Sequence, residues 1–457
     1  MNKPFLRTGS EEPKRLNIAV VGAGISGLGA AWLLSKNHAV TLFEKDDRLG
    51  GHANTATVDY DGKEIPVDTG FIVYNRTNYP NLIALFDRLG VATEASDMSF
   101  SVSQRSGGFE WAWAGDRPVA IFAQKRNVLN LKFYSLIGEI QHFRRQGLHA
   151  HLSGNPPTGS LEDFIAGLGL SDAFRTQYLL PLGAAIWSSP GRSILDFPAE
   201  NFLRFFFNHH LLSLGKAHWR TVTGGSQCYV RKVTGDMDAE IRQGVGVTRV
   251  VRREDGVELT LSDGSTQPFD QVVLATHSDQ ALSLLDEPDA DEKRLLGALR
   301  YSDNKAYLHR DQALMPQRRA AWASWNSISK GRGESTGPVF VSYWMNRLQN
   351  IDKSTPLFVS LNPDEPPREA LTFSEYTYAH PQFDRAAIEA QRGLGLIQGR
   401  RGVWFCGAYC GNGFHEDGLS AGLDVAEALG GALRPWAAQQ TDRMDTRVET
   451  AYAPAAE

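Results

Sequence analysis

The fold is decided by the stretch Leu16-Asn17-Ile18-Ala19-Val20-Val21-Gly22-Ala23-Gly24-Ile25-Ser26-Gly27. Its first six residues form a mostly apolar, β-branched run that predicts a buried parallel strand. The segment from Leu28 to Lys36 is rich in alanine and leucine and predicts a helix. A second strand is expected over 39–43 and ends at Glu44. This order of strand, glycine turn, helix and strand predicts a βαβ unit that binds a dinucleotide.

Each part of the turn has a physical role in such a site. Gly22 permits the tight turn, Gly24 lets the backbone approach a pyrophosphate, and Gly27 lets the helix pack close to the strand. The start of the helix supplies free N–H groups and a partial positive charge for the phosphates. Glu44 can accept hydrogen bonds from a ribose. The residues assigned to the cofactor here are Gly22, Ala23, Gly24, Ile25, Ser26, Gly27 and Glu44.

The residues after Glu44 help to decide which dinucleotide is bound. The run Lys45-Asp46-Asp47-Arg48-Leu49-Gly50-Gly51-His52 can bring charge and backbone back to the pyrophosphate. Two short strands, 56–60 and 63–67, are joined by Asp61-Gly62, which indicates a hairpin. The run Asp68-Thr69-Gly70-Phe71 ends that hairpin.

Later segments extend the same half of the molecule. The segments 246–252 and 257–262 predict a strand pair, and 269–277 predicts a buried strand. A final strand over 403–407 leads through a glycine-rich loop into a helix predicted over 419–429. A strand that enters a helix N-terminus in this way makes a further site for an anion or a carbonyl group.

The run from Ile18 to Phe71 resembles the flavin-containing amine oxidase and phytoene desaturase superfamily. The resemblance implies an α/β fold of the two-dinucleotide-binding-domain flavoprotein type, with a discontinuous Rossmann-like FAD-binding domain and an α+β substrate domain. The FAD-binding domain is expected over 16–80, 220–285 and 400–432, the substrate domain over 81–219 and 286–399, and flexible tails over 1–15 and 433–457. Only one complete dinucleotide motif is present, which favours an oxidase, desaturase or isomerase over an NAD(P)H-dependent reductase.

The resemblance also implies which residues hold noncovalent FAD. Beyond the glycine turn and Glu44 they are Lys45, Arg48, Gly50, Gly51, His52, Thr69, Gly70, Phe71, Val247, Gly407, Asp417, Gly418 and Leu419. In the family, the last helix points its N-terminus at the pyrimidine edge of the flavin. This chain departs from the pattern at Tyr409, where many amine oxidases carry Glu.

Four residues are candidates for chemistry beside the flavin: Lys305, His415, Glu416 and Tyr74. A lysine desolvated over the ring can polarise water or oxygen, and the alternative is a surface lysine on a strand. His415 can act as an acid or base near neutral pH, while Glu416 serves as a base or anchors the loop. Tyr74 and Asn78 are expected either near the ring or in packing.

The expected substrate domain is aromatic. Residues 201–212 predict an apolar helix that lines a lipid tunnel, dips into a membrane surface or lies in the core. The runs 111–113 and 322–325 place tryptophans in alternation and are expected to cover the substrate cavity. The stretches 314–326 and 411–418 resemble a bacterial branch that is often encoded beside cyclopropane-fatty-acyl synthase-like methyltransferases.

That branch implies an unsaturated or methylated fatty acyl chain as the substrate, and hence an FAD-dependent desaturase or oxidase. The alternatives are an FAD-dependent double-bond isomerase, an amine oxidase and a noncatalytic flavin-binding lipid carrier. The expected partner is a hydrophobic small molecule or lipid, with peripheral membrane contact as a further expectation.

Composition excludes other classes of protein. The net charge of −5 gives no general attraction to nucleic acid, and no apolar run is long enough to span a bilayer. The three cysteines, Cys228, Cys406 and Cys410, are too few for a disulfide framework, and no second pair supports a metal site. We expect a cytoplasmic protein, at most peripheral to a membrane, and the sequence leaves its oligomeric state open.

Overall fold

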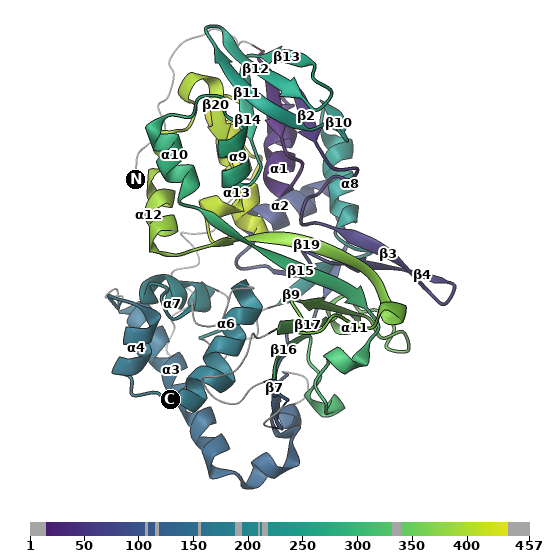
Figure 1. Cartoon of the computed structure of the whole chain (residues 1–457), viewed down its shortest axis with the longest axis vertical. Coiled ribbons are helices and arrows are strands. Elements are labelled where there is room, and N and C mark those ends of the chain that lie inside the picture. Colours follow the sequence, from purple (N-terminus) through teal and green to yellow (C-terminus); the bar gives the residue numbers. More distant parts are fainter. Residues whose placement is uncertain are drawn as a thin grey trace, which may run out of the picture.

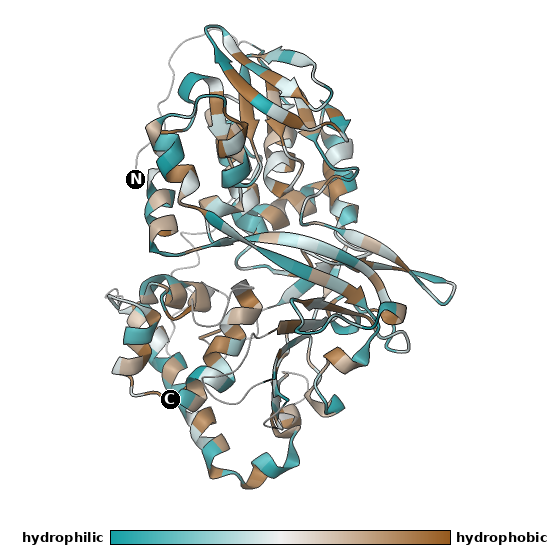
Figure 2. Ribbon diagram, in the orientation of Figure 1, coloured by the Kyte–Doolittle hydropathy of each residue, from teal (hydrophilic) through white to brown (hydrophobic). Residues whose placement is uncertain are grey.

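The nucleotide-binding half is built around a parallel five-stranded sheet. The computed structural model describes residues 15–105, 108–114, 118–153, 157–187, 194–208, 211–212, 218–330 and 340–436. The sheet has the strand order β10 (Ala239–Gln243), β2 (Ala39–Glu44), β1 (Asn17–Val21), β14 (Gln271–Leu274) and β20 (Val403–Phe405). It occupies the upper half of Figure 1, and its central strands are hydrophobic in Figure 2 because helices cover them.

Two glycine-rich helices pack closely beside this sheet. Helix α1 (Ile25–Leu34) is entirely buried and lies against α13 (His415–Ala428). A Cβ atom at Gly422 would lie 2.1 Å from the Ser26 carbonyl oxygen, so only glycine permits this approach. Helices α2 (Pro80–Leu89) and α8 (Gln227–Asp236) complete the same apolar core.

Three smaller sheets accompany the parallel sheet. Strands β11 (Val247–Arg253), β12 (Gly256–Leu261) and β13 (Thr266–Phe269) form an antiparallel sheet. Strands β3 (Thr55–Tyr60) and β4 (Lys63–Asp68) form the predicted hairpin, and the backbone at its turn is left-handed at Asp61 and Gly62. A three-stranded sheet joins β5 (Tyr74–Asn75), β9 (Trp219–Val222) and β6 (Thr93–Ala95).

The other half contains a seven-stranded sheet and a group of helices. The sheet has the order β19 (Thr372–Gln382), β15 (Arg300–His309), β18 (Phe358–Leu361), β17 (Phe340–Trp344), β16 (Trp325–Ser329), β7 (Phe100–Gln104) and β8 (Phe109–Trp113). Strands β15 and β19 cross the middle of the molecule, between the two halves (Figure 1). The helices are α3 (Leu131–Leu152), α4 (Leu161–Gly167), α5 (Asp172–Phe174), α6 (Leu180–Trp187) and α7 (Ala199–Asn208). No helix within the described ranges has the length and apolarity needed to cross a membrane.

Several helices lie in a different half from the one that the sequence boundaries give them. Helix α2 shares the apolar core of α1 and α13, although residues 81–89 were expected in the substrate domain. Helices α10 (Ala290–Gly297) and α12 (Arg385–Gly393) also contribute to a core shared with the parallel sheet. These amphipathic helices carry no sequence motif. Their domain is decided by the core against which their apolar face packs, and the sequence does not show that core.

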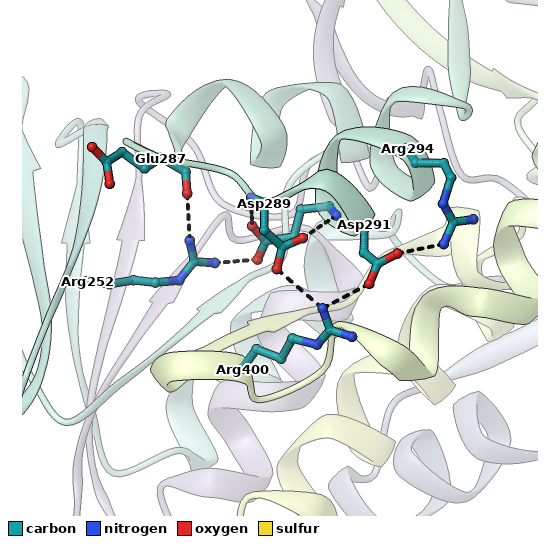
Figure 3. A network of polar contacts seen from close by, with 7 residues as sticks. Arg252, Glu287, Asp289, Asp291, Arg294 and Arg400 are labelled. Atoms are coloured by element: carbon teal, nitrogen blue, oxygen red, sulfur yellow. Dashed lines mark hydrogen bonds and ion pairs between the residues drawn. The ribbon is translucent and has the colours of Figure 1, made fainter.

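An ionic network fixes α10 to the nucleotide-binding half (Figure 3). Arg400 forms ion pairs with Asp289 at 3.3 Å and Asp291 at 3.1 Å. Arg252 of β11 forms an ion pair with Glu292, and both of these side chains are buried. Asp291 also pairs with Arg294 of the same helix at 2.8 Å, whereas Arg400 and Arg252 tie the start of α10 to the rest of this half.

Candidate active site

The glycine turn forms a cradle that suits a pyrophosphate. Gly22 has a positive φ of 99°, and a Cβ at Gly27 would lie 1.8 Å from the Gly22 carbonyl oxygen. At Gly24, by contrast, an added Cβ meets no atom within 4 Å. Gly24 caps α1 without any side-chain hydrogen bond. The helix N-terminus therefore faces open space with its N–H groups available, as a bound diphosphate requires.

Glu44 occupies the position expected of the ribose-binding acid. One of its carboxylate oxygens accepts a hydrogen bond from Ala23 N at 2.8 Å and the other from Asp46 N at 3.0 Å. Val245 N donates to the Glu44 carbonyl oxygen, which brings the strand that starts at Val247 beside the acid. Lys45 is exposed at the same edge. The residues predicted to hold the adenosine part thus converge at the end of β2.

The two loops that follow are tied to each other. Arg48 donates to the Gly51 carbonyl oxygen at 2.8 Å, and Gly50 N donates to the Ala23 carbonyl oxygen at 2.8 Å. Phe71 N donates to the His52 carbonyl oxygen at 2.7 Å, and a Cβ at Gly70 would lie 2.1 Å from that oxygen. Loop 50–52 therefore lies against both the glycine turn and loop 69–71.

A buried carboxylate, Asp68, anchors the second loop. It accepts hydrogen bonds from Ser226 N at 2.8 Å and Thr55 Oγ1 at 2.6 Å, and a further one from Gln349. Burial raises the pKa of Asp68 to about 6, although these donors oppose the shift. Asp68 was not among the expected site residues, and its role is to fix the backbone that carries Thr69, Gly70 and Phe71.

The start of α13 meets the same loop. His415 stacks on Phe71, with ring centroids 3.8 Å apart, and its Nε2 atom lies 2.8 Å from the Tyr229 hydroxyl oxygen. Burial lowers the pKa of His415 to about 3, so the ring is neutral at physiological pH. Asp417 accepts a hydrogen bond from Phe414 N at 2.9 Å, and burial raises the pKa of Asp417 to about 6. The helix begins at His415, four residues before the predicted start.

Close packing joins the first turn of α13 to that of α1. A Cβ at Gly418 would lie 2.9 Å from both Ile25 Cγ2 and Ser26 Oγ. Leu419 is fully buried, and its side chain fills the space over Gly29. The side chain of Leu419 therefore packs between helices, so any cofactor contact there must come from its backbone. Gly407, which precedes the loop, is covered by the ring of Tyr409.

Four aromatic side chains gather where the two halves meet. The ring centroid of His52 lies 5.5 Å from that of His380, 5.1 Å from that of Tyr378 and 6.1 Å from that of His277. Burial lowers the pKa of all three histidines, that of His380 to about 4. We name this group, His52, His277, His380 and Tyr378, the histidine cluster. Its imidazoles are neutral near pH 7.

The tautomer of His380 is set by a neighbouring amide. Asn362 Nδ2 donates to Asn304 Oδ1 at 2.7 Å, which turns the Asn304 amide nitrogen toward His380 Nδ1 at 3.1 Å. Because the amide nitrogen can only donate, Nδ1 accepts, and the neutral ring carries its proton on Nε2. Asn304 is 1% exposed. It is the buried neighbour of the predicted Lys305.

The prediction of a desolvated Lys305 is wrong. The Lys305 side chain is 61% exposed and forms an ion pair with Glu375 at 2.9 Å. Side chains alternate across a strand, so β15 turns Asn304 inward and Lys305 to solvent. The pKa of Lys305 is raised by its hydrogen bond with Glu375, which is the opposite of what desolvation does.

Glu416 anchors a helix and is not free to act as a base. Its carboxylate accepts hydrogen bonds from Asn81 N at 2.8 Å, Asn81 Nδ2 at 2.8 Å and Leu82 N at 3.0 Å. These donors lie at the N-terminus of α2, where a negative charge is favoured. Burial nevertheless raises the pKa of Glu416 to about 7.

Tyr74 packs in the core of the nucleotide-binding half. Its ring meets Phe86 and Tyr79 edge to face, with centroids 5.5 Å and 6.1 Å away. Of the two readings, packing is therefore the one that the contacts of Tyr74 support. The side-chain nitrogen of Asn78 is buried without a hydrogen-bond partner within the described part of the chain.

The tryptophans expected to cover one substrate cavity lie in different apolar groups. Trp111 is buried in the helical core, Trp113 is partly exposed, and Trp322 packs with Trp344 in a separate cluster. Trp325 belongs to yet another apolar group, around β17 and β18. Strands β8 and β16 both pair with β7 in one sheet, yet alternation alone does not show which face of each strand meets a cavity.

A groove lies instead between α7 and α12, with a volume of about 320 Å³. Phenylalanines from both halves line it, and Arg204, Arg392 and Glu200 lie beside them. Gly411 and Asn412, of the loop that leads to His415, also line it. Phe414 of this loop stacks on Phe205 of α7, with centroids 5.2 Å apart. Helix α7 thus lines the groove and also packs in the core. Of the helix expected over 201–212, residues 209–210 lie outside the described ranges, as do residues 213–217 that follow it.

Sequence reasoning missed His277, His380, Tyr378 and Asn304. Tyr378 accepts a hydrogen bond from Asn54 at 2.9 Å, and its hydroxyl oxygen lies 2.6 Å from Thr69 Oγ1. Asn304 lies in β15, Tyr378 and His380 lie in β19, and His277 follows β14. No recognisable sequence motif surrounds any of them. The sequence offered one indication of them, namely polar residues at the inward-facing positions of β15 and β19. A polar side chain buried in a strand must find a hydrogen-bond partner, which often marks a functional position.

Comparison with known proteins agrees with this geometry. The model of the family "Flavin containing amine oxidoreductase" matches residues 25–306. The (S)-6-hydroxynicotine oxidase of Paenarthrobacter nicotinovorans is 26% identical over 281 residues, which cover 60% of this chain and 63% of that enzyme. The L-amino-acid oxidase of Pseudechis australis is 46% identical over 54 residues, 12% of this chain and 10% of that enzyme. The chain therefore spans less than two thirds of these curated relatives.

Solved structures share the fold over nearly the whole chain. A CLA-producing fatty acid isomerase from P. acnes has a TM-score of 0.64 at 15% identity and covers 92% of this chain and 99% of its own. Wild-type putrescine oxidase bound to putrescine has a TM-score of 0.60 at 17% identity, with coverages of 91% and 99%. The open cradle at Gly24, the acid Glu44 and the tied loops fit the cofactor of such proteins. The chain belongs to the flavin-containing amine oxidoreductase family, and its cofactor is FAD.

Proposed function

We propose that this protein is an FAD-dependent desaturase or oxidase that acts on an acyl chain. The observation that carries the proposal is the groove between α7 and α12, in which phenylalanines lie beside Arg204 and Arg392. Such a surface suits an amphiphile, because the aromatic rings bury a hydrocarbon chain and an arginine pairs with a carboxylate or phosphate. The loop that leads to His415, at the expected flavin edge, contributes Gly411 and Asn412 to the lining of the groove.

The reaction removes two hydrogens from neighbouring carbons and leaves a double bond between them. FAD held by the glycine turn and loop 50–52 would supply the acceptor for one of them as a hydride, with dioxygen as the final oxidant and hydrogen peroxide as its product. Loss of the hydride leaves positive charge on carbon, and the faces of Tyr378 and the neutral imidazoles can stabilise it. A neutral imidazole of the histidine cluster then accepts the proton from the adjacent carbon.

The low pKa values of the cluster suit this order of events. A weakly basic imidazole cannot remove a proton from an ordinary carbon, but it can accept one from a carbon next to a cation. His380 presents Nε2 with its proton attached, so we assign the accepting role to His52 and a hydrogen-bond-donating role to His380. Asn304 acts through His380 as a positioning residue.

An FAD-dependent double-bond isomerase is the second candidate. The fold likeness to the P. acnes isomerase favours it, although an identity of 15% indicates a shared fold and not a shared substrate. In an isomerase the hydride returns to another carbon, so that no dioxygen is consumed. The groove suits an amine substrate less well. Arg204 and Arg392 repel an ammonium group, and among the lining residues Glu200 alone attracts it.

The test is anaerobic mixing of the FAD-loaded protein with acyl substrates. Monounsaturated and methyl-branched fatty acids, and phospholipids that carry them, should bleach the visible flavin absorbance, and air should restore it with formation of hydrogen peroxide. A shifted double bond without oxygen uptake would identify the isomerase. Bleaching by amines such as putrescine, with no response to any lipid, would overturn the acyl proposal.

A pair of variants on one helix tests the groove. Arg392→Gln should raise KM for an anionic acyl substrate by about tenfold or more, because a charge-assisted hydrogen bond is lost. Arg385→Gln changes an equally charged residue of α12, which pairs with Glu389 outside the groove, and should leave KM unchanged. Equal KM values for both variants would remove the groove from the substrate path.

A further inference from the structure

Exposed apolar side chains gather at one end of the substrate half. Leu129 is 90% exposed, Leu131 is 84% exposed and Val119 is 78% exposed, while Val128 and Tyr134 are about half exposed. They belong to the 3-10 helices η1 (Pro118–Phe122) and η2 (Lys125–Leu129) and to the first turn of α3. We call this surface, made of Val119, Val128, Leu129, Leu131 and Tyr134, the apolar tip. It lies at the lower end of Figure 1, in the blue segment that leads into α3.

The apolar tip is a built structure. Tyr134 donates a hydrogen bond from its hydroxyl to the Val128 carbonyl oxygen at 2.9 Å, which ties η2 to α3. The Asn130 side chain caps α3 by accepting from Lys132 N at 3.1 Å. Beneath the surface, Phe133 is buried against Phe122 and Phe109. These contacts fix the backbone that carries Leu129 and Leu131. The two leucine side chains therefore face water unless another surface covers them.

The charge around the apolar tip is positive. Residues 118–138 contain Lys125, Arg126 and Lys132 and no acidic residue, in a chain whose net charge is −5. All three basic side chains are exposed, and Lys125 and Arg126 line a shallow hollow of about 390 Å³ together with Arg318. Figure 2 shows hydrophobic and hydrophilic segments side by side at this end. Apolar residues ringed by cations complement an anionic lipid surface, where the leucines enter the acyl boundary and the cations meet phosphates.

We infer that the apolar tip docks the protein onto an anionic membrane. This inference does not depend on the proposed acyl substrate. It replaces residues 201–212 as the membrane contact, because Phe202, Leu203 and Phe206 of α7 are buried in the protein core. Helix α3 runs from the apolar tip to α7, where Gly147 lies against Leu203. With a rise of about 1.5 Å per residue, α3 holds the groove roughly 25 Å from the docked end.

The experiment is cosedimentation of the FAD-loaded protein with vesicles. Vesicles that contain phosphatidylglycerol should bind the protein, pure phosphatidylcholine vesicles should bind it far more weakly, and added salt should release it. Removing the charge at Lys125 and Lys132 should weaken binding by about fivefold for each position. Binding that is equal on both kinds of vesicle would overturn the inference.

Two matched substitutions locate the contact. Leu129→Glu combined with Leu131→Glu should weaken binding by about tenfold or more, because both side chains leave the acyl boundary. Leu396→Glu changes another exposed leucine, 58% exposed and on the nucleotide-binding half, and should bind like the unaltered protein. Both variants should keep the melting temperature and flavin absorbance, since the changed side chains are exposed.

Three further outcomes would overturn the inference. The first is no binding of the unaltered protein to either vesicle. The second is undiminished binding of the double variant. The third is that the unaltered protein self-associates in solution and the double variant does not, which would make the apolar tip a contact between copies of this chain.

Discussion

Phe71 and His415 lie face to face, with ring centroids 3.8 Å apart and ring planes 8° from parallel. One residue ends the loop that follows the β3–β4 hairpin, and the other begins α13, more than 300 positions later in the chain. The hydroxyl of Tyr229, in α8, forms a hydrogen bond with the Nε2 atom of the His415 imidazole. The stack thus joins three separate stretches of the nucleotide-binding half at the expected edge of the flavin.

Replacing His415 by Phe should keep the stack and lose the hydrogen bond to Tyr229. The buried Tyr229 hydroxyl is then left unpaired, which costs about 1–3 kcal/mol of unfolding free energy. The double variant Tyr229→Phe/His415→Phe removes both partners and should recover part of the loss. Urea unfolding of the three proteins measures this, and a double variant less stable than the single one would contradict it.

The same pair predicts how stability changes with pH. The pKa of His415 is about 3 in the folded protein and near 6.5 in an unfolded chain. The unfolded chain therefore binds more protons between these values, and the stability that His415 contributes is lost as the pH falls from 6.5 toward 3. The difference in unfolding free energy between the unaltered protein and Tyr229→Phe/His415→Phe should shrink across that window. A pH-independent difference would show that His415 titrates normally.

Two glycines allow cofactor binding to be separated from folding. Alanine at Gly422 would place its methyl group 2.1 Å from the Ser26 carbonyl oxygen and should lower stability by about 1–3 kcal/mol or more. Alanine at Gly24 meets no protein atom within 4 Å, and the φ of −70° there suits any residue. Gly24→Ala should therefore fold normally without FAD and bind it weakly, because the methyl group enters the space for the diphosphate. Thermal unfolding of cofactor-free protein and FAD titration provide the two measurements.

Lys305 and Asn304 are neighbours in β15, but substituting them should affect flavin turnover differently. Lys305→Met removes an exposed ion pair and should leave flavin turnover unchanged. Asn304→Leu removes the donor to His380 Nδ1 and frees the tautomer of that ring, so turnover should fall and its pH profile should shift. Steady-state oxygen uptake over a pH series measures both. Slower turnover in Lys305→Met with an unaffected Asn304→Leu would reverse the assignment.

Glu416 is predicted to affect stability more than chemistry. Glu416→Gln turns an amide N–H toward a backbone N–H of α2, either at Asn81 or at Leu82, and should lower stability by about 1–3 kcal/mol. Turnover per bound flavin should stay close to that of the unaltered protein. A large fall in turnover at full FAD occupancy would instead support the catalytic role that the sequence suggested.

The nucleotide-binding half could be predicted closely because its residues act through local backbone geometry. The glycine turn, the second strand ending at Glu44 and the Asp61-Gly62 hairpin each depend on neighbours within a short stretch, and each forms as expected. The histidine cluster could not be predicted, because His52 lies in the loop after β2, His277 follows β14 and His380 lies within β19, and only the packed fold brings them together. For Lys305 the error was one of strand register, since shifting by one residue exchanges the two faces.

The hydroxyl of Tyr378 has a consequence for how this protein can be divided. It belongs to β19 in the sheet of the substrate half, yet it contacts Asn54 and Thr69 around the hairpin of the other half. The parallel sheet likewise collects strands from the beginning, the middle and the end of the chain. No single cut separates the two halves into intact fragments, so a protease that nicks one surface loop should leave a protein that stays assembled. Variation in substrate would then have to arise within the substrate half, because one contiguous cassette that carries all its strands would also carry β10 and β14 of the parallel sheet.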